Sequence, residues 1–134
     1  HRHTPEIEQE LGANQMVTFT PHLVPMSRGI LSTIYVDLKG ARTVDELRHH
    51  LIDVYKGEAF IHILSEGQLP STSQVRGSNY CAIAISKERR TGKAIIVSAI
   101  DNLTKGSSGQ AIHNMNLMFD LAEDTGLRHL AVFP

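Results

Sequence analysis

Two apolar segments and the polar turn between them, YCAIAIS (residues 80–86), KERRTG (87–92) and KAIIVSAI (93–100), determine the fold class. Both apolar segments contain several β-branched residues and have the length of a β-strand. The connection is charged and ends on Gly92, which suits a reversal of the chain. The sequence therefore predicts an antiparallel hairpin.

The residues before this hairpin predict a third strand. Between residues 30 and 38, apolar side chains recur with a period of two, at Ile30, Ile34, Val36 and Leu38. This alternation is typical of a long, half-buried strand.

The segment from Thr43 to Val54 predicts a helix. Thr43 and Glu46 have the spacing of a capping box, in which the hydroxyl and the carboxylate each accept a hydrogen bond from the other residue's backbone N–H. Apolar residues then follow at helical spacing, at Val44, Leu47, Leu51 and Val54.

Shorter patterns complete the predicted element order. They indicate a helix over residues 4–11, strands over 17–20, 59–64 and 130–133, and a loop over 66–79. A second capping box, Ser107 to Gln110, predicts a helix with Ile112, Met115 and Phe119 on one side. Strands with helices between them favour an α+β fold with a mixed or antiparallel sheet. Helices would cover one face of the sheet, and the other face is a candidate oligomer interface.

Length and charge limit the class of protein. The 134 residues suffice for one domain with a core that needs neither disulfides nor metals. Thirteen Lys and Arg residues against 14 Asp and Glu residues give a formal net charge of -1. This balance disfavours nucleic acid as the main partner, because phosphate binding needs a basic surface. No apolar run approaches the roughly 20 residues of a membrane helix, so we expect a soluble intracellular domain without membrane contact.

The sequence begins with two histidines, in His1-Arg2-His3. Imidazoles titrate near neutral pH and suit proton transfer, and the arginine between them suits a carboxylate or phosphate. A solvated helix start is the simpler interpretation of the spacing alone. No third ligand stands at a spacing typical of zinc sites, so we predict no metal site.

Three other positions are candidates for chemistry. Arg28, directly before Gly29 and a predicted strand, is either an anion ligand or a surface arginine. The loop DNLTKGSSGQ (101–110) precedes a predicted helix, whose free N–H groups favour anions, although an ordinary capped helix is the simpler interpretation. The loop has neither the P-loop spacing nor a GxGxxG turn. Cys81 lies in an apolar strand, and we expect a buried thiol rather than a nucleophile.

Four segments occur together in one order: HRHTPEI (1–7), TPHLVPMSRGI (20–30), GSN (77–79) and the stretch from DNL (101–103) to MN (115–116). In that order they resemble the C-terminal part of the N-acetyl-gamma-glutamyl-phosphate reductase family. The resemblance implies an α+β fold with a mixed, largely antiparallel sheet and helices on one face. This is the fold class of the C-terminal domains of glyceraldehyde-3-phosphate and aspartate-semialdehyde dehydrogenase-like enzymes.

The resemblance implies an NADPH-dependent reduction in arginine biosynthesis. N-acetyl-glutamyl 5-phosphate would become N-acetyl-glutamate 5-semialdehyde, with release of phosphate. In the family a cysteine thiolate attacks the acyl phosphate, hydride from the cofactor reduces the resulting thioester, and a histidine handles protons.

The resemblance also implies roles for individual residues. One of His1 and His3 would be the general acid/base, and the choice between them stays open. Arg28, Ser27 and His22 would line the pocket for the anionic substrate. Asn102 would lie close to the nicotinamide, with Gly106 beside it at the start of the helix.

The chain departs from the family pattern at two places. It lacks the Gly-Cys-[Phe/Tyr]-x-Thr motif of the nucleophile and the glycine-rich nucleotide-binding turn. We therefore expect residues 1–134 to form the substrate-binding and dimerisation domain of a longer enzyme, with NADP(H) bound mainly by the missing domain. Alone, the chain should be inactive. We further expect a homo-oligomer formed through the sheet, in the cytoplasm or in an organelle of a eukaryote.

Two alternatives remain open from the sequence. One is a non-catalytic α+β module that binds an anionic metabolite or forms a structural dimer, which would explain the missing nucleophile without a missing domain. The other is a related acyl-phosphate reductase of lysine biosynthesis.

Overall fold

The computed structural model describes residues 3–12, 16–40 and 42–132. Along the chain the elements are α1 (His3–Leu11), β1 (Ile30–Val36), α2 (Val44–Val54), β2 (Ile61–Ile63), the 3₁₀ turn η1 (Ser73–Val75), β3 (Cys81–Lys87), β4 (Ala94–Ile100), the π-helical turn η2 (Thr104–Ser108) and α3 (Gly109–Met118). This arrangement is α+β, as predicted.

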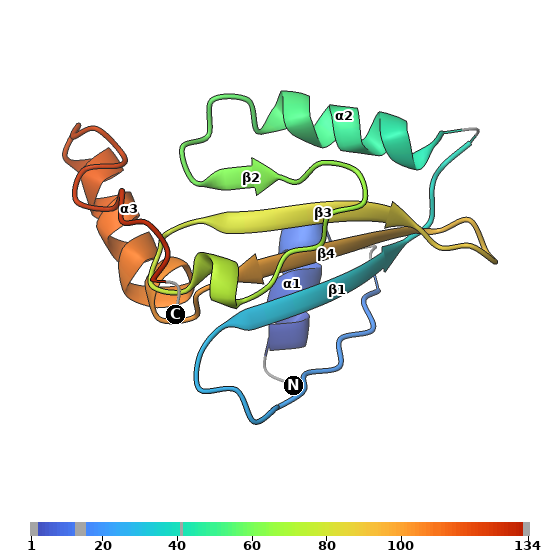
Figure 1. Cartoon of the computed structure of the whole chain (residues 1–134), viewed down its shortest axis with the longest axis horizontal. Coiled ribbons are helices and arrows are strands. Elements are labelled where there is room, and N and C mark those ends of the chain that lie inside the picture. Colours follow the sequence, from blue (N-terminus) through green and yellow to red (C-terminus); the bar gives the residue numbers. More distant parts are fainter. Residues whose placement is uncertain (1–2, 13–15, 41, 133–134) are drawn as a thin grey trace.

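The four strands form one mixed sheet in the order β1-β4-β3-β2 (Figure 1). β3 and β4 form the predicted antiparallel hairpin, and β1 pairs antiparallel with β4 on its other side. Among the strands that the structure describes, β2 alone runs parallel to its neighbour, β3. Two of the three pairings are therefore antiparallel, which confirms the prediction of a mixed, largely antiparallel sheet.

Each face of the sheet has a different cover. In the view of Figure 1, α1 lies behind the strands, whereas η1 and its loop lie in front of them. The front cover carries Val75, which packs with Ala82 and Ala99 in the buried core. Ala82 and Ala99 are direct partners in the β3–β4 register, so their side chains point to the same face. Their small size lets the η1 loop approach the strands closely.

Two predicted strands are wrong. The described residues 17–20 and 130–132 have no strand structure, and Phe133 lies outside the described residues. Residues 17–20 alternate apolar and polar side chains, but no neighbouring strand in the described structure supplies backbone partners for them. At the other end, the Val132 N–H donates a single hydrogen bond of 2.8 Å to the Arg76 carbonyl, which does not make a ladder.

The two predicted capping boxes have different outcomes. At α2 the box is formed: the Glu46 N–H donates to Thr43 Oγ1 (3.1 Å), and the Thr43 N–H donates to Glu46 Oε2 (2.6 Å). At α3 the prediction is wrong, because the helix continues directly from η2 and makes no side-chain cap. The Ser108 hydroxyl instead donates back to the Leu103 carbonyl (2.7 Å).

This contrast gives a stability prediction. Thr43→Ala removes a formed cap and should lower the free energy of unfolding by about 1 kcal/mol. Ser107→Ala alters an exposed side chain without a capping role and should change it by less than about 0.5 kcal/mol. Urea unfolding followed by circular dichroism compares the two variants, and an equal loss in both would contradict the assignment of the caps.

Candidate functional site

The register of β1 and β4 brings two loops together. Ile30, the first residue of β1, is paired with Ile100, the last residue of β4. The residues just before Ile30 therefore meet the residues just after Ile100, although more than 70 positions separate them. Arg28 and Asp101 meet at this place, with 2.6 Å between Arg28 Nε and Asp101 Oδ2.

Asp101 is the centre of the contacts at this place. Its side chain is fully buried. Oδ1 accepts hydrogen bonds from the N–H groups of Leu103 and Thr104, both at 2.8 Å, and Oδ2 accepts one from the Gly77 N–H at 2.7 Å. Burial by itself raises the pKa of this carboxyl, but the Gly77 N–H, the Arg28 guanidinium and the N–H groups of Thr104 and Leu103 together hold the pKa well below its usual range. Asp101 is thus a carboxylate at any physiological pH.

Arg28 is anchored on one side only. Its Nη2 donates to Thr104 Oγ1 at 3.1 Å, in addition to the ion pair at Nε. About a third of the side chain, 31%, remains exposed. A guanidinium has five N–H donors in a planar fork, so these two contacts leave donors for a further acceptor. Such an edge suits the oxygens of a phosphate or carboxylate.

Asn102 is held in one orientation by Gly29. The Gly29 N–H donates to Asn102 Oδ1 at 2.7 Å, which assigns the oxygen and the nitrogen of the amide. The Nδ2 group is thus the donor that Asn102 can offer to a ligand. Gly29 itself has φ +109°, and a Cβ at this position would lie 2.7 Å from Thr72 Cβ. Only glycine fits here, for backbone and for steric reasons.

The structure brings some of the predicted site residues together and leaves others apart. Arg28 and Asn102 meet as described, and Gly106 lies on the same loop, where its N–H donates to the Asp101 carbonyl at 2.9 Å. Ser27 is exposed beside Arg28, and exposed His22 makes a ring-nitrogen contact of 3.1 Å with the Thr20 carbonyl. His3 lies at the start of α1. The contacts of Asp101 described above do not involve Ser27, His22 or His3. His1 lies outside the described residues.

Sequence analysis missed Asp101 as a site residue. The available signal was an aspartate directly after an apolar strand. Its side chain can accept hydrogen bonds from the backbone N–H groups of the residues that follow, which is the pattern of an Asx turn. The pattern predicts only the local turn. Arg28 and Gly77 are distant from Asp101 in sequence and meet its carboxylate only in the folded chain.

A second group of polar residues surrounds Phe60, which is buried. Its ring lies 5.4 Å from the His113 ring, and Lys105 Nζ stands 5.7 Å from the Phe60 centroid. His113 is also buried, with Nε2 3.5 Å from Glu123 Oε2. Burial lowers the pKa of Lys105, and the negative charges near it offset this in part. The group links α3 to the β2 side of the sheet.

Cys81 lies close to this group. Burial raises the pKa of its thiol, and the charge of Lys105 offsets the increase only in part. A thiol with a raised pKa is a poor nucleophile near neutral pH, because the thiolate is the reactive form. The thiol is half-buried, not fully buried as the sequence predicted.

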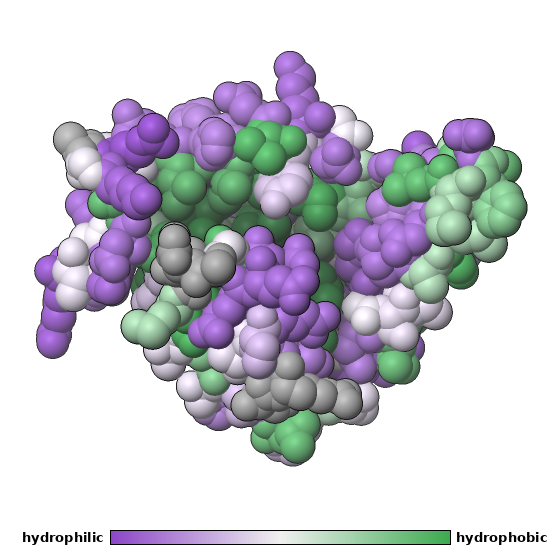
Figure 2. Space-filling view, turned by 180° about the vertical axis from the view of Figure 1, so that it is seen from behind, coloured by the Kyte–Doolittle hydropathy of each residue, from purple (hydrophilic) through white to green (hydrophobic). Residues whose placement is uncertain are grey.

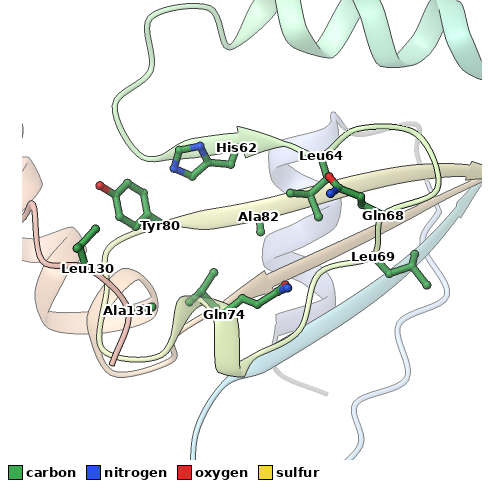
Figure 3. Close-up of a pocket in the computed structure, with 10 residues that line it drawn as sticks. His62, Leu64, Gln68, Leu69, Gln74, Tyr80, Ala82, Leu130 and Ala131 are labelled. Atoms are coloured by element: carbon green, nitrogen blue, oxygen red, sulfur yellow. The ribbon is translucent and has the colours of Figure 1, made fainter. Parts of the chain in front are cut away.

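A cavity of about 520 Å³ opens on the front face (Figure 3), and Arg28 is not among the described residues that line it. His62 and Tyr80 stand next to each other at one side of it, with ring centroids 4.7 Å apart. The other lining residues are mostly apolar, together with Gln68 and Gln74. None of the described lining residues is Lys or Arg, so the cavity does not suit a phosphorylated ligand.

The described parts of the chain offer neither a cluster of metal ligands nor a membrane-spanning helix. Residues 3–12, 16–40 and 42–132 contain no group of three or more His, Cys, Asp or Glu side chains placed to hold a metal ion. Within the same ranges, every helix is too short or too polar to cross a lipid bilayer.

The raised pKa of Cys81 gives a prediction for labelling. At pH 7.5 the folded chain should react with iodoacetamide at least tenfold more slowly than the chain unfolded in urea, and its rate should keep rising above pH 9, because the thiolate forms late. Mass spectrometry of timed samples measures both rates. Equal rates in the folded and unfolded chain at pH 7.5 would contradict the described environment of the thiol.

Comparisons with known proteins agree with this architecture. Residues 1–102 match the family described as "Semialdehyde dehydrogenase, dimerisation domain". Over its whole length the chain is 54% identical to the N-acetyl-gamma-glutamyl-phosphate reductase of Geobacter metallireducens, 57% to that of Pelobacter propionicus and 51% to that of Pelotomaculum thermopropionicum. The chain spans 40% of the length of each of these relatives. The protein therefore belongs to the semialdehyde dehydrogenase dimerisation-domain family.

Proposed function

We propose that this chain is the C-terminal part of an NADP-dependent N-acetyl-gamma-glutamyl-phosphate reductase, an enzyme of arginine biosynthesis. The reaction would convert N-acetyl-glutamyl 5-phosphate into N-acetyl-glutamate 5-semialdehyde and phosphate. Identities of 51–57% over the whole chain to proteins with this name support the proposal. The chain would contribute substrate-binding and acid/base residues, and another part of the enzyme would contribute the nucleophilic cysteine.

The observation that carries the proposal is the partly exposed guanidinium of Arg28. The substrate is an anion with a planar carboxylate and a phosphate, and both recognise the fork of an arginine. Arg28 is held at Nε and at one Nη, which leaves an edge for such a ligand. Ser27 lies next to it in an exposed position, and we assign it and His22 to the same pocket.

Asn102 fits a place beside the nicotinamide. NADPH would supply the hydride when bound, mainly held by the part of the enzyme outside this chain. The Gly29 N–H occupies Asn102 Oδ1, so the side chain would offer Nδ2 as a donor, which matches the carbonyl oxygen of a carboxamide. Gly106, on the same loop, leaves room close to Asn102 because it has no side chain.

A histidine from the start of the chain would transfer protons. His3 lies at the exposed N-terminal end of α1, and we assign the acid/base role to His1 or His3. Without a reactive cysteine the chain alone would have no nucleophile, since the thiol of Cys81 has a raised pKa. We therefore expect it to be inactive in isolation.

The polarity of α3 supports the assignment to a larger enzyme. The buried residues of this helix are Gly109, His113 and Asn116, two of them polar. The sequence predicted that Ile112, Met115 and Phe119 line one side of the helix, and these side chains are 40%, 45% and 68% exposed, with Phe119 at the C-cap. Met118 is 79% exposed as well. A helix with this polarity has its apolar face directed at a surface outside the described structure. We propose that this surface belongs to the cofactor-binding part of the same polypeptide.

The sheet supports a homo-oligomer. Both faces of the edge strand β1 carry exposed apolar side chains, with Tyr35 63% and Leu31 52% exposed toward the front and Ile34 45% exposed toward the rear. Figure 2 shows the rear view, in which apolar side chains line a hollow between polar surfaces. The η1 loop covers Ala82 and Ala99 on the front face but leaves Leu31 and Tyr35 of β1 exposed, so we assign this part of the front face to the contact with a second copy. We place the enzyme in the cytoplasm, or in an organelle if the source is a eukaryote.

Arg28→Ala in the complete protein tests the proposed activity. The KM for N-acetyl-glutamyl phosphate should rise at least tenfold, because a charge-assisted hydrogen bond of about 1.5–3 kcal/mol is lost. The KM for NADPH should stay within twofold. Steady-state kinetics by NADPH absorbance measures both.

Arg89→Ala is the matched control, because it removes the same charge from the exposed β3–β4 turn. It should leave both KM values unchanged. An equal rise of the two KM values in Arg28→Ala, or turnover of a lysine-pathway acyl phosphate in preference to the proposed substrate, would contradict the proposal.

Substitutions on the two faces of β1 test the oligomer. Tyr35→Asp, on the front face, should convert a dimer into a monomer, because a buried unpaired charge is costly at an interface. Ile34→Asp, on the rear face, should leave the dimer intact. Light scattering after size exclusion measures the mass, and loss of the dimer in Ile34→Asp alone would assign the interface to the opposite face.

A further inference from the structure

We propose that Asp101 is a positioning residue for the substrate: its buried carboxylate sets the direction in which Arg28 presents its guanidinium. This inference rests on the proposed function, in which Arg28 binds the acyl phosphate. Asp101 would not touch the substrate, and would act entirely through Arg28.

The carboxylate of Asp101 cannot turn. Oδ1 accepts from two N–H groups, of Leu103 and Thr104, and Oδ2 accepts from the Gly77 N–H. These three donors belong to backbone on two different loops, so both oxygens are fixed before Arg28 is considered. The position of Oδ2 is thus a property of the fold.

Arg28 takes its direction from this fixed oxygen. Its Nε lies 2.6 Å from Oδ2, and its Nη2 donates to Thr104 Oγ1 at 3.1 Å. A planar group held at two points on one edge keeps its plane, so the opposite edge faces a constant direction. Without the contact at Nε, a long side chain that is 31% exposed would regain several rotamers.

The chemistry of the pair favours geometric selection over simple charge attraction. The carboxylate of Asp101 compensates the charge of Arg28, so the pair carries no net charge toward an incoming anion. What remains is a rigid pair of donors, which favours an acceptor with two oxygens in one plane. This is the geometry of a carboxylate or of two phosphate oxygens.

Asp101→Asn in the complete protein tests the inference. Asparagine keeps the shape but places a neutral amide where the carboxylate pairs with Arg28 and accepts a hydrogen bond from the Gly77 N–H. We expect the KM for the acyl phosphate to rise about tenfold while kcat and the KM for NADPH stay within threefold. In the Arg28→Ala background, the same substitution should change the substrate KM by less than twofold, because the residue through which it acts is gone.

The two single variants and the double variant form a double-mutant cycle, and each of its outcomes decides for or against the positioning role of Asp101. Multiplicative effects of Arg28→Ala and Asp101→Asn would overturn the positioning role and leave only a structural one. An unchanged substrate KM in Asp101→Asn would also overturn it. If Arg28→Ala itself leaves the substrate KM unchanged, the proposed function fails first, so the two failures are distinguishable.

Chemical rescue of activity by added guanidinium distinguishes a positioning role of Asp101 from a purely structural one. Millimolar guanidinium should restore activity to Arg28→Ala, because Asp101 still offers its acceptor, and should not restore the double variant. Ser78→Ala is the structural control, since buried Ser78 donates to the Val75 carbonyl on the neighbouring loop. It should lower Tm without changing the substrate KM. Rescue of the double variant to the same extent would overturn the inference.

If Asp101→Asn does not fold, the unsubstituted protein still answers the question. With ¹⁵N-labelled arginine, the Nε–H signal of Arg28, assigned by its loss in Arg28→Lys, should exchange slowly with solvent. An Nε–H that exchanges as fast as that of Arg89 would overturn the inference.

Discussion

One buried carboxylate holds the described part of this site together. The antiparallel register of β1 and β4 places the start of one strand beside the end of the other, and Asp101 stands at that junction. Burial alone would make an ionised side chain costly at this place. Three backbone N–H groups and a guanidinium offset that cost, so the loops that carry Arg28, Gly77 and Thr104 have a single common point of attachment.

The fold divides its polar and apolar groups in an unusual way. The helix α3 buries Gly109, His113 and Asn116 and exposes its large apolar residues, and the edge strand β1 exposes apolar residues on both faces. A chain that spans 40% of its relatives would have such surfaces wherever the rest of the enzyme or a second copy covers it. In the proposed reductase, this domain would serve both as one wall of the substrate site and as a surface for assembly.

The local patterns of the sequence predicted the elements that satisfy their own backbone groups. The hairpin and the cap of α2 are of this kind, because each depends on residues that are close in sequence. β1 was predicted from the alternation of its side chains, although its backbone partner β4 is distant in sequence. The strand predicted over residues 17–20 failed because alternation alone supplies no partner for its backbone. The side chains on α3 were predicted at the correct spacing, but the spacing does not tell which surface they face. Arg28 and Asn102 were predicted through the family resemblance, whereas Asp101 depends on a pairing between distant segments and had only a local signal.

Gly29 has a consequence for attempts to alter the specificity of such an enzyme. Two separate constraints exclude a side chain at this position: the backbone has φ +109°, and Thr72 occupies the space of a Cβ. A smaller residue at position 72 would remove only the second of them. Combinatorial libraries aimed at new substrates should thus keep position 29 constant and randomise Ser27, which is exposed on the other side of the arginine and has no such restriction.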